Sequence, residues 1–174
     1  LIGKLDAATT LQNLVASLEW LAKHPKGNGK VGAVGFCWGG GMVGQLAVKE
    51  PRLAAGVVYY GRQPDAAGVP SIKAPLLLHY AGLDTRINEG IPAFEAALKA
   101  AGTRYTVHVY EGANHAFNND SSEARYNKET AELAWGRTIT FLKSTLGTGA
   151  GTPSTLPTAP SPAAPSPAAP PRKE

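Results

Sequence analysis

The sequence of 174 residues has little of several features that would narrow its function. Its single cysteine, Cys37, excludes an internal disulfide, so the fold does not rely on an oxidising compartment. No apolar stretch approaches the roughly 18 residues that a membrane-spanning helix needs. Basic residues outnumber acidic ones by only 17 to 13, without a run of Lys or Arg. We therefore expect neither nucleic acid nor a membrane as a partner.

The chain also lacks an initiator methionine, because it opens on Leu1 inside a helix-like pattern. We therefore interpret the first residue as a cut within a longer protein. The absence of disulfides favours a cytoplasmic location. A signal peptide could precede Leu1, which leaves a periplasmic or secreted location open.

Apolar residues almost disappear near the C-terminus. Residues 147–174 are mostly Pro, Ala, Ser, Thr and Gly, with one leucine. Such a segment cannot bury enough apolar surface to offset its ordering entropy. We expect 1–146 to form one domain and 147–174 a disordered tail, either a spacer or a docking segment for a Pro-binding domain.

Helical and strand patterns alternate along the domain. The sequence predicts strands at 30–36, 53–61, 74–82 and 105–111, and helices at 11–22, 40–50, 88–101 and 131–142. Asn88 is the expected N-cap of the third helix, and Asp120 with Glu123 forms a capping pair before the last. Near-continuous apolar strands separated by helices predict an α/β fold, a parallel sheet of about four strands flanked by helices.

A glycine-rich turn, VGFCWGGG (34–41), follows the first predicted strand. Its pattern, G-x-nucleophile-x-G, is typical of a nucleophile displayed on a sharp turn between a strand and a helix. We expect Gly35 and Gly39 to be required by close backbone contacts, and the helix N-terminus to favour the thiolate of Cys37. The alternatives are an inert buried cysteine and a phosphate-binding turn, although no lysine follows to hold a phosphate.

Two further polar residues follow later strands. Asp84 comes after the third strand and His115 after the fourth, in a polar loop. The carboxyl ends of parallel strands share one edge of a sheet, so these side chains should lie near Cys37. The order nucleophile, acid, histidine is that of α/β-hydrolases, which predicts a Cys37–His115–Asp84 triad.

The quoted stretches resemble the dienelactone hydrolase (carboxymethylenebutenolidase) family of α/β-hydrolases. The likeness rests on VGFCWGGG, YYG (59–61), HYAGLD (79–84), YEGANHAF (110–117) and the last helix, ARYNKETAELAWGRTITFLK (124–143), and covers roughly residues 5–146. It implies the C-terminal portion of an α/β-hydrolase fold, acting on a small ester or lactone through a thioester acyl-enzyme without cofactor or metal.

The resemblance also implies roles for residues around the triad. The N–H of Trp38 is an expected oxyanion donor, and Tyr60, Arg86 and Phe117 are expected to contact substrate. Family members carry about four earlier strands, which supply a second oxyanion donor, an acidic residue and an arginine. A second family arginine closely follows the histidine, where this chain has HAFNND instead. Arg86 and Arg125 are candidate substitutes, although both could equally be surface charges.

Three other hypotheses about the function stay open. The chain could be a thioesterase or another acyl hydrolase of the same fold, or a truncated, weakly active or inactive module that binds ligands. A redox thiol ranks lower, because the chain has no second cysteine to resolve it. The first strand, without the earlier strands, would be an exposed apolar edge, so we expect marginal stability or self-association through it.

Overall fold

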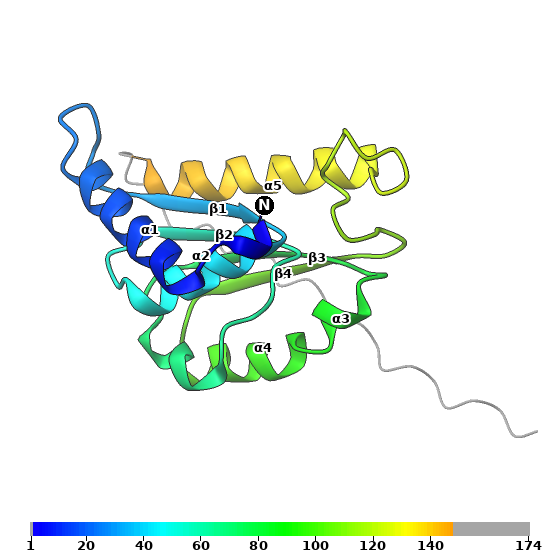
Figure 1. Ribbon diagram of the computed structural model, residues 1–174, viewed down its shortest axis with the longest axis horizontal. Helices are drawn as coiled ribbons and strands as arrows, with labels where there is room; N and C mark the ends of the chain where they lie inside the picture. Colours follow the sequence, from blue (N-terminus) through cyan, green and yellow to red (C-terminus); the bar gives the residue numbers. More distant parts are fainter. Residues whose placement is uncertain (1, 148–174) are drawn as a thin grey trace, which may run out of the picture.

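The computed structural model describes residues 2–147 as a three-layer α/β/α arrangement (Figure 1). The elements in order are η1 (Ile2–Lys4), α1 (Ala7–Ala22), β1 (Gly32–Phe36), α2 (Trp38–Lys49), β2 (Ala55–Tyr59), η2 (Ala66–Ser71), β3 (Leu76–Ala81), α3 (Thr85–Asn88), α4 (Ile91–Ala100), β4 (Tyr105–Tyr110) and α5 (Lys128–Leu146). The strands form one parallel sheet in the order β1-β2-β3-β4. This confirms the α/β fold with four parallel strands expected from the sequence.

The sheet separates two apolar clusters. Residues of α1, α2 and α4 pack on one face, and residues of α5 pack on the other. In Figure 1, α5 lies along one side of the strands while α1, α2 and α4 lie across from it. Strand β3 shows how the sequence produces this, because successive side chains point to opposite faces. Leu76, Leu78 and Tyr80 enter the first cluster, whereas Leu77 and Ala81 enter the second.

Two predicted helix caps are wrong. Asn88 ends the short helix α3, and its side-chain amide donates to the carbonyls of Ala81 and Gly82 at 2.8 and 3.3 Å. The following helix, α4, begins at Ile91 and has no side-chain cap. Helix α5 begins at Lys128, where Asn127 accepts a hydrogen bond from the Thr130 N–H at 3.0 Å. Asn88 is therefore used to hold the end of β3, which local capping rules do not anticipate.

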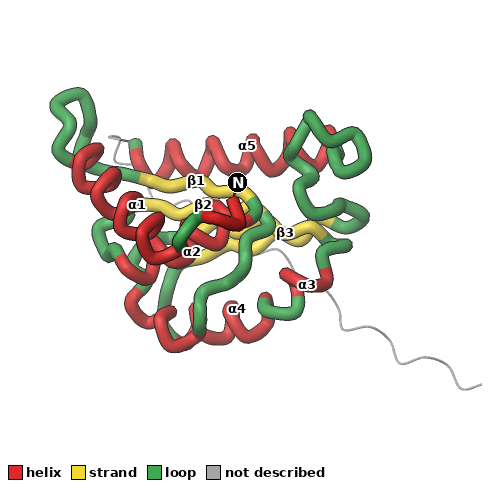
Figure 2. Tube along the Cα trace, viewed as in Figure 1, coloured by secondary structure: helices red, strands yellow, loops and turns green. Residues whose placement is uncertain are grey.

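The longest loop of residues 2–147 joins β4 to α5, and the loop after β3 lies at the same edge of the sheet (Figure 2). Backbone hydrogen bonds tie these loops together. The Gly82 N–H donates to the Tyr110 carbonyl at 2.8 Å, and the Leu83 N–H donates to the Ala113 carbonyl at 3.0 Å. The segments that follow β3 and β4 are thus held side by side.

Strand β1 pairs only with β2 within residues 2–147, so it is an edge strand. Its residues are mostly half-buried, and Phe36 at its end is 38% exposed. Self-association through this edge stays a prediction. Apart from Gly147, the tail predicted at 147–174 lies outside the described residues. None of the helices described here combines the length and the apolar character needed to cross a membrane.

Candidate active site

Cys37 stands alone between β1 and α2 on a strained turn. Its backbone angles are φ 53° and ψ −122°, a region that residues with a side chain seldom occupy. Two hydrogen bonds hold this conformation: the Cys37 N–H donates to the Tyr59 carbonyl at 3.0 Å, and the Cys37 carbonyl accepts from the Gly41 N–H at 3.2 Å. Strain of this kind persists only where the surroundings enforce it, and it is frequent at functional sites.

The glycines around the turn have different roles. A Cβ on Gly35 would overlap the backbone of Gly39, as expected. The matching expectation for Gly39 is wrong, because a Cβ there would meet nothing within 4 Å. The close contact comes instead from Gly40, whose Cβ would lie 2.8 Å from the Tyr59 carbonyl oxygen, and from Gly61, which faces Gly40. Thus α2 approaches the end of β2 closely, and this brings Cys37 beside Tyr60.

The thiol of Cys37 is half-buried and stays protonated more readily than an exposed one. Burial raises the pKa of Cys37, the Arg125 guanidinium lowers it, and the Asp84 carboxylate raises it. The net direction is upward, opposite to the one we expected from the helix N-terminus. The thiol therefore needs a base if it is to attack as a thiolate.

Asp84 and His115 form a hydrogen-bonded pair at the same edge of the sheet. The Nδ1–H of His115 donates to Oδ2 of Asp84 at 2.5 Å. The Asp84 side chain is 8% exposed and the His115 side chain 27%. Since Nδ1 is occupied by the carboxylate, Nε2 is the ring nitrogen left to accept a proton.

The loop that carries His115 is anchored by aromatic side chains. Phe117 is completely buried, with its ring centroid 5.1 Å from that of Tyr60 and 5.2 Å from that of Tyr110. The Tyr60 ring also lies 5.0 Å from the His115 ring. Ala116, between the histidine and its anchor, has φ 68°. Packing below the loop thus sets where the imidazole lies.

The remaining predicted residues are placed as follows. Trp38 opens α2, and within residues 2–147 its N–H donates to no acceptor. Tyr60 is 2% exposed, so neither it nor Phe117 presents an open surface to a ligand. Arg86 is exposed on α3, and the Arg125 guanidinium lowers the pKa of the Cys37 thiol.

One interaction of the predicted triad is missing. Across residues 2–147, no hydrogen bond joins the Cys37 thiol to His115 or to any other group. Both side chains pack against Tyr60 and its neighbours, however, and the Asp84 charge reaches the thiol. The same range holds no group of three or more His, Cys, Asp or Glu suited to a metal ion.

A buried polar network beneath the site was not anticipated. The fully buried ring of His79 on β3 shares hydrogen bonds with the Tyr110 hydroxyl at 2.9 Å and the Thr138 hydroxyl at 3.1 Å. Thr138 Oγ1 also lies 2.7 Å from the Tyr59 hydroxyl. The spacing of polar residues on four separate elements gave no signal that they would meet.

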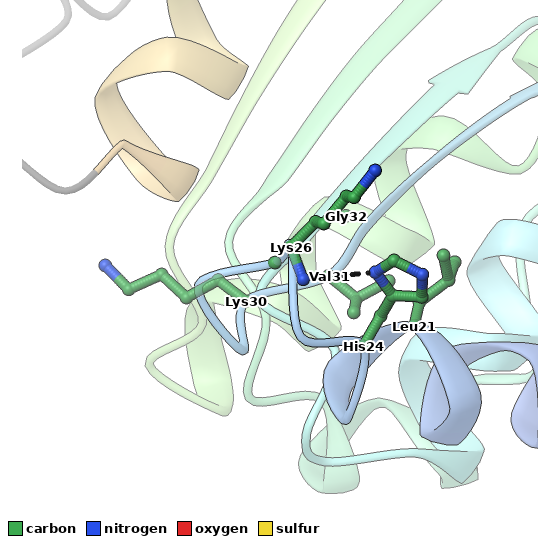
Figure 3. Close-up of a pocket in the computed structure, with 7 residues that line it drawn as sticks. Leu21, His24, Lys26, Lys30, Val31 and Gly32 are labelled. Carbon is green, nitrogen blue, oxygen red and sulfur yellow. Dashed lines mark hydrogen bonds between the residues drawn. The ribbon is translucent and has the colours of Figure 1, made fainter.

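One hollow of the molecule lies well away from this edge. It has a volume of about 290 Å³ and is formed by the end of α1 and the start of β1 (Figure 3). Leu21, Lys30 and Val31 line it together with His24, whose Nδ1 accepts from the Lys26 N–H at 3.3 Å. Because Cys37 follows the opposite end of β1, this hollow does not belong to the candidate active site.

A strand-to-helix turn with a strained cysteine, followed in order by an acid and its histidine partner at later strand ends, is typical of an α/β-hydrolase arrangement. The comparisons with known proteins narrow this class. The family model described as "Dienelactone hydrolase family" matches residues 2–146, and the chain belongs to that family.

Individual proteins similar to this chain agree with the family assignment. A candidate carboxymethylenebutenolidase from Saccharolobus solfataricus is 37% identical, over 76% of this chain and 51% of its own length. A carboxymethylenebutenolidase from Pseudomonas putida is 33% identical, over 79% and 58%. The structure of a dienelactone hydrolase from Anabaena variabilis is 27% identical, with a TM-score of 0.63 over 81% of this chain and 62% of that one. The chain spans about half the length of the curated relatives it matches.

Proposed function

We propose that Cys37, His115 and Asp84 act together to hydrolyse a small ester or lactone through a thioester acyl-enzyme. The observation that carries the proposal is the 2.5 Å hydrogen bond from His115 to Asp84 at the sheet edge where the strained turn presents Cys37. Membership of a hydrolase family, and likeness to a carboxymethylenebutenolidase, support the reaction class.

The first half of the reaction forms the acyl-enzyme. Nε2 of His115 takes the thiol proton, and Sγ of Cys37 attacks the carbonyl carbon. Because burial raises the pKa of the thiol, this proton transfer has to accompany substrate binding. The thiol must also turn toward Nε2, since no hydrogen bond joins the two groups beforehand. Asp84 holds the imidazole in the required tautomer and stabilises its charged form.

The acyl-enzyme is complete when the tetrahedral intermediate collapses: the C–O bond breaks, and the alcohol oxygen takes the proton held on His115. The second half releases the acid. Nε2 takes a proton from water, whose oxygen attacks the thioester carbonyl; the C–S bond then breaks, and Sγ takes the proton back from His115 as the carboxylic acid departs. The free Trp38 N–H can donate to the oxyanion in both halves. Losing one such donor typically costs about 10²–10³ in turnover.

Arg125 is a better candidate than Arg86 for the cation at this site. Its guanidinium lowers the pKa of Cys37. We assign Arg125 to stabilising the thiolate or an acidic substrate. Tyr60 and Phe117, being buried, support the His115 loop and act on substrate only through it.

Acylation of Cys37 tests the proposal directly. The chain has one cysteine, so mass spectrometry after mixing with a p-nitrophenyl ester reports an acyl group on a single thiol. We expect a transient adduct in the parent chain, none in Cys37→Ser, and slower acylation by at least about 10²-fold in His115→Ala. His24→Ala, at the opposite end of the sheet, is the matched control and should acylate normally. Normal acylation of His115→Ala would refute the assigned base.

A ligand-binding module without catalysis is the second candidate. The raised pKa of the Cys37 thiol and its missing hydrogen bond to His115 favour it. Under this alternative the parent chain forms no adduct, and His115→Ala leaves the slow reaction of Cys37 with iodoacetamide unchanged. A panel of esters, lactones and thioesters would then separate the remaining hydrolase classes if adducts do form.

A further inference from the structure

A hollow of about 370 Å³ lies between α5 and the strands β3 and β4. It contains none of the residues of the candidate active site. Its walls include Leu77, Leu133 and Phe141, which are apolar, together with His108, Gly136 and Arg137. The volume is within the range of pockets that hold small organic ligands.

Arg137 contacts Tyr110 at this hollow and has no acidic partner among residues 2–147. Its Nη1–H donates to the Tyr110 hydroxyl at 3.1 Å, and its guanidinium carbon lies 5.5 Å from the centre of the Tyr110 ring. Over residues 2–147, no carboxylate oxygen lies within 4 Å of the guanidinium. A half-buried cation without a counter-charge is costly, and an anion in the hollow would offset that cost.

His108 does not compete for such an anion. Burial, and then the charge of Arg137, lower the pKa of His108 to about 4, so the imidazole is uncharged at neutral pH. The one acidic side chain at the hollow, Glu132, is 68% exposed and lies 3.8 Å from Lys128. It therefore sits at the solvent-exposed rim, where its charge is screened.

Gly136 keeps the hollow open. It lies inside α5, where a glycine weakens a helix, and a Cβ there would meet nothing within 4 Å. Neither backbone strain nor close packing therefore explains the glycine. The absent side chain leaves space beside Arg137 that a larger residue would fill.

We propose that this hollow binds small carboxylates that have an apolar body. The carboxylate contacts the free N–H groups of Arg137, whose planar guanidinium suits two parallel hydrogen bonds. The apolar body lies against Leu133 and Phe141. This site is independent of the proposed hydrolysis, since it shares no residue with it.

Titration of the isotope-labelled full chain with benzoate, followed by NMR, tests the proposal. We expect shifts centred on His108, Gly136 and Arg137, and at least 10-fold weaker binding of the neutral isostere benzamide. Arg137→Gln should weaken benzoate binding at least 10-fold, because glutamine can still donate to Tyr110 but carries no charge. Gly136→Leu should weaken it as much by filling the hollow, and covers the case in which Arg137→Gln disturbs the fold.

Arg104→Gln is the matched control, since it removes one exposed arginine that does not line the hollow and should leave benzoate affinity unchanged. Equal affinity in the parent chain and in Gly136→Leu would overturn the proposal. So would equal binding of benzamide and benzoate, or shifts centred on Cys37 and His115, which would assign benzoate to the candidate active site instead.

Discussion

The two faces of the sheet are built in different ways. Under α1, α2 and α4, the buried side chains of β3 are Leu76, Leu78 and Tyr80, and the cluster around them is almost entirely apolar. Under α5, the same strand places His79 at the centre of a polar network that reaches Tyr110 and Thr138. Strand β3 therefore places apolar side chains on one face of the sheet and a hydrogen-bonded histidine on the other.

The two faces of the sheet contribute differently: one mainly stabilises the fold, and the other also fixes the positions of particular side chains. Apolar burial is favourable but non-directional, so the first face can hold the fold together without fixing any one group. Hydrogen bonds fix direction, and the second face uses them to hold the hydroxyls of Tyr59 and Tyr110. The rings of these tyrosines lie 6.2 and 5.2 Å from that of Phe117, the anchor of the His115 loop. The polar network thus lies on the face that supports the candidate active site.

Truncating the apolar face should have the largest effect on stability. Leu78 is 1% exposed, and Leu78→Ala leaves a cavity in the middle of that cluster. We expect the free energy of unfolding to fall by about 4 kcal/mol, as for other buried leucines. Urea denaturation measures it, with the 50% exposed Leu133→Ala as the control that should change by less than about 1 kcal/mol. Equal losses in the two variants would contradict this view of the apolar face.

Acid should weaken the polar face selectively. Burial, reinforced by the charges of His108 and Arg137, lowers the pKa of His79 to about 3, against an ordinary 6.5. The unfolded chain therefore binds a proton that the folded chain refuses, so stability is full above pH 6.5 and is lost as the pH falls toward 3. Between pH 6.5 and 4.5 we expect His79 to contribute a loss of about 2 kcal/mol, and His108, whose pKa burial lowers to about 4, to contribute a similar loss.

Urea denaturation at several pH values checks this expectation. His79→Gln should be less stable at neutral pH but should lose less stability between pH 6.5 and 4.5. His24→Gln, far from the network, should keep the slope of the parent chain. A parent chain whose stability does not change over this interval would show that His79 is not held uncharged.

Removing one hydroxyl from the polar network should cost less than truncating the apolar face. Thr138→Val keeps the shape of the side chain but deprives both the Tyr59 hydroxyl and His79 Nε2 of a partner. We expect a loss of about 2 kcal/mol, because buried polar groups are left unpaired. The NMR signals of His115 should also move, since the Tyr59 ring packs against Phe117. Unmoved His115 signals would separate the network from the site.

The sequence predicted the fold well because the pattern of apolar residues is enough to locate the strands. The apolar runs ending near Phe36, Tyr59, Ala81 and Tyr110 are the four strands found, within two residues. Parallel pairing then follows from the intervening helices. Helix starts were predicted less well. Asn88 and Asp120 have suitable side chains for caps, but a hydrogen bond to the end of β3 uses Asn88, and α5 begins eight residues after Asp120.

The candidate site also has features that the sequence predicted and features that it did not. Asp84 and His115 could be placed at one edge from their positions after strands, and they do meet. The burial of Tyr60, Phe117 and the Cys37 thiol could not be inferred, because it depends on which helix covers each strand end. The buried network is the extreme case, since His79, Tyr110 and Thr138 lie far apart in sequence and have no shared motif.

The smallest predicted effect concerns α5, the helix that covers the polar face. Gly136→Ala places a methyl group where nothing lies within 4 Å and removes a poor helix former from a helix interior. We expect a gain of about 1 kcal/mol in the free energy of unfolding. Gly40→Ala in α2 makes the same change where the Cβ would lie 2.8 Å from the Tyr59 carbonyl oxygen, and it should destabilise instead. Thermal melts of the two variants should therefore shift in opposite directions. A loss of stability in Gly136→Ala would mean that α5 packs more closely over β4 than the open hollow beside Arg137 implies.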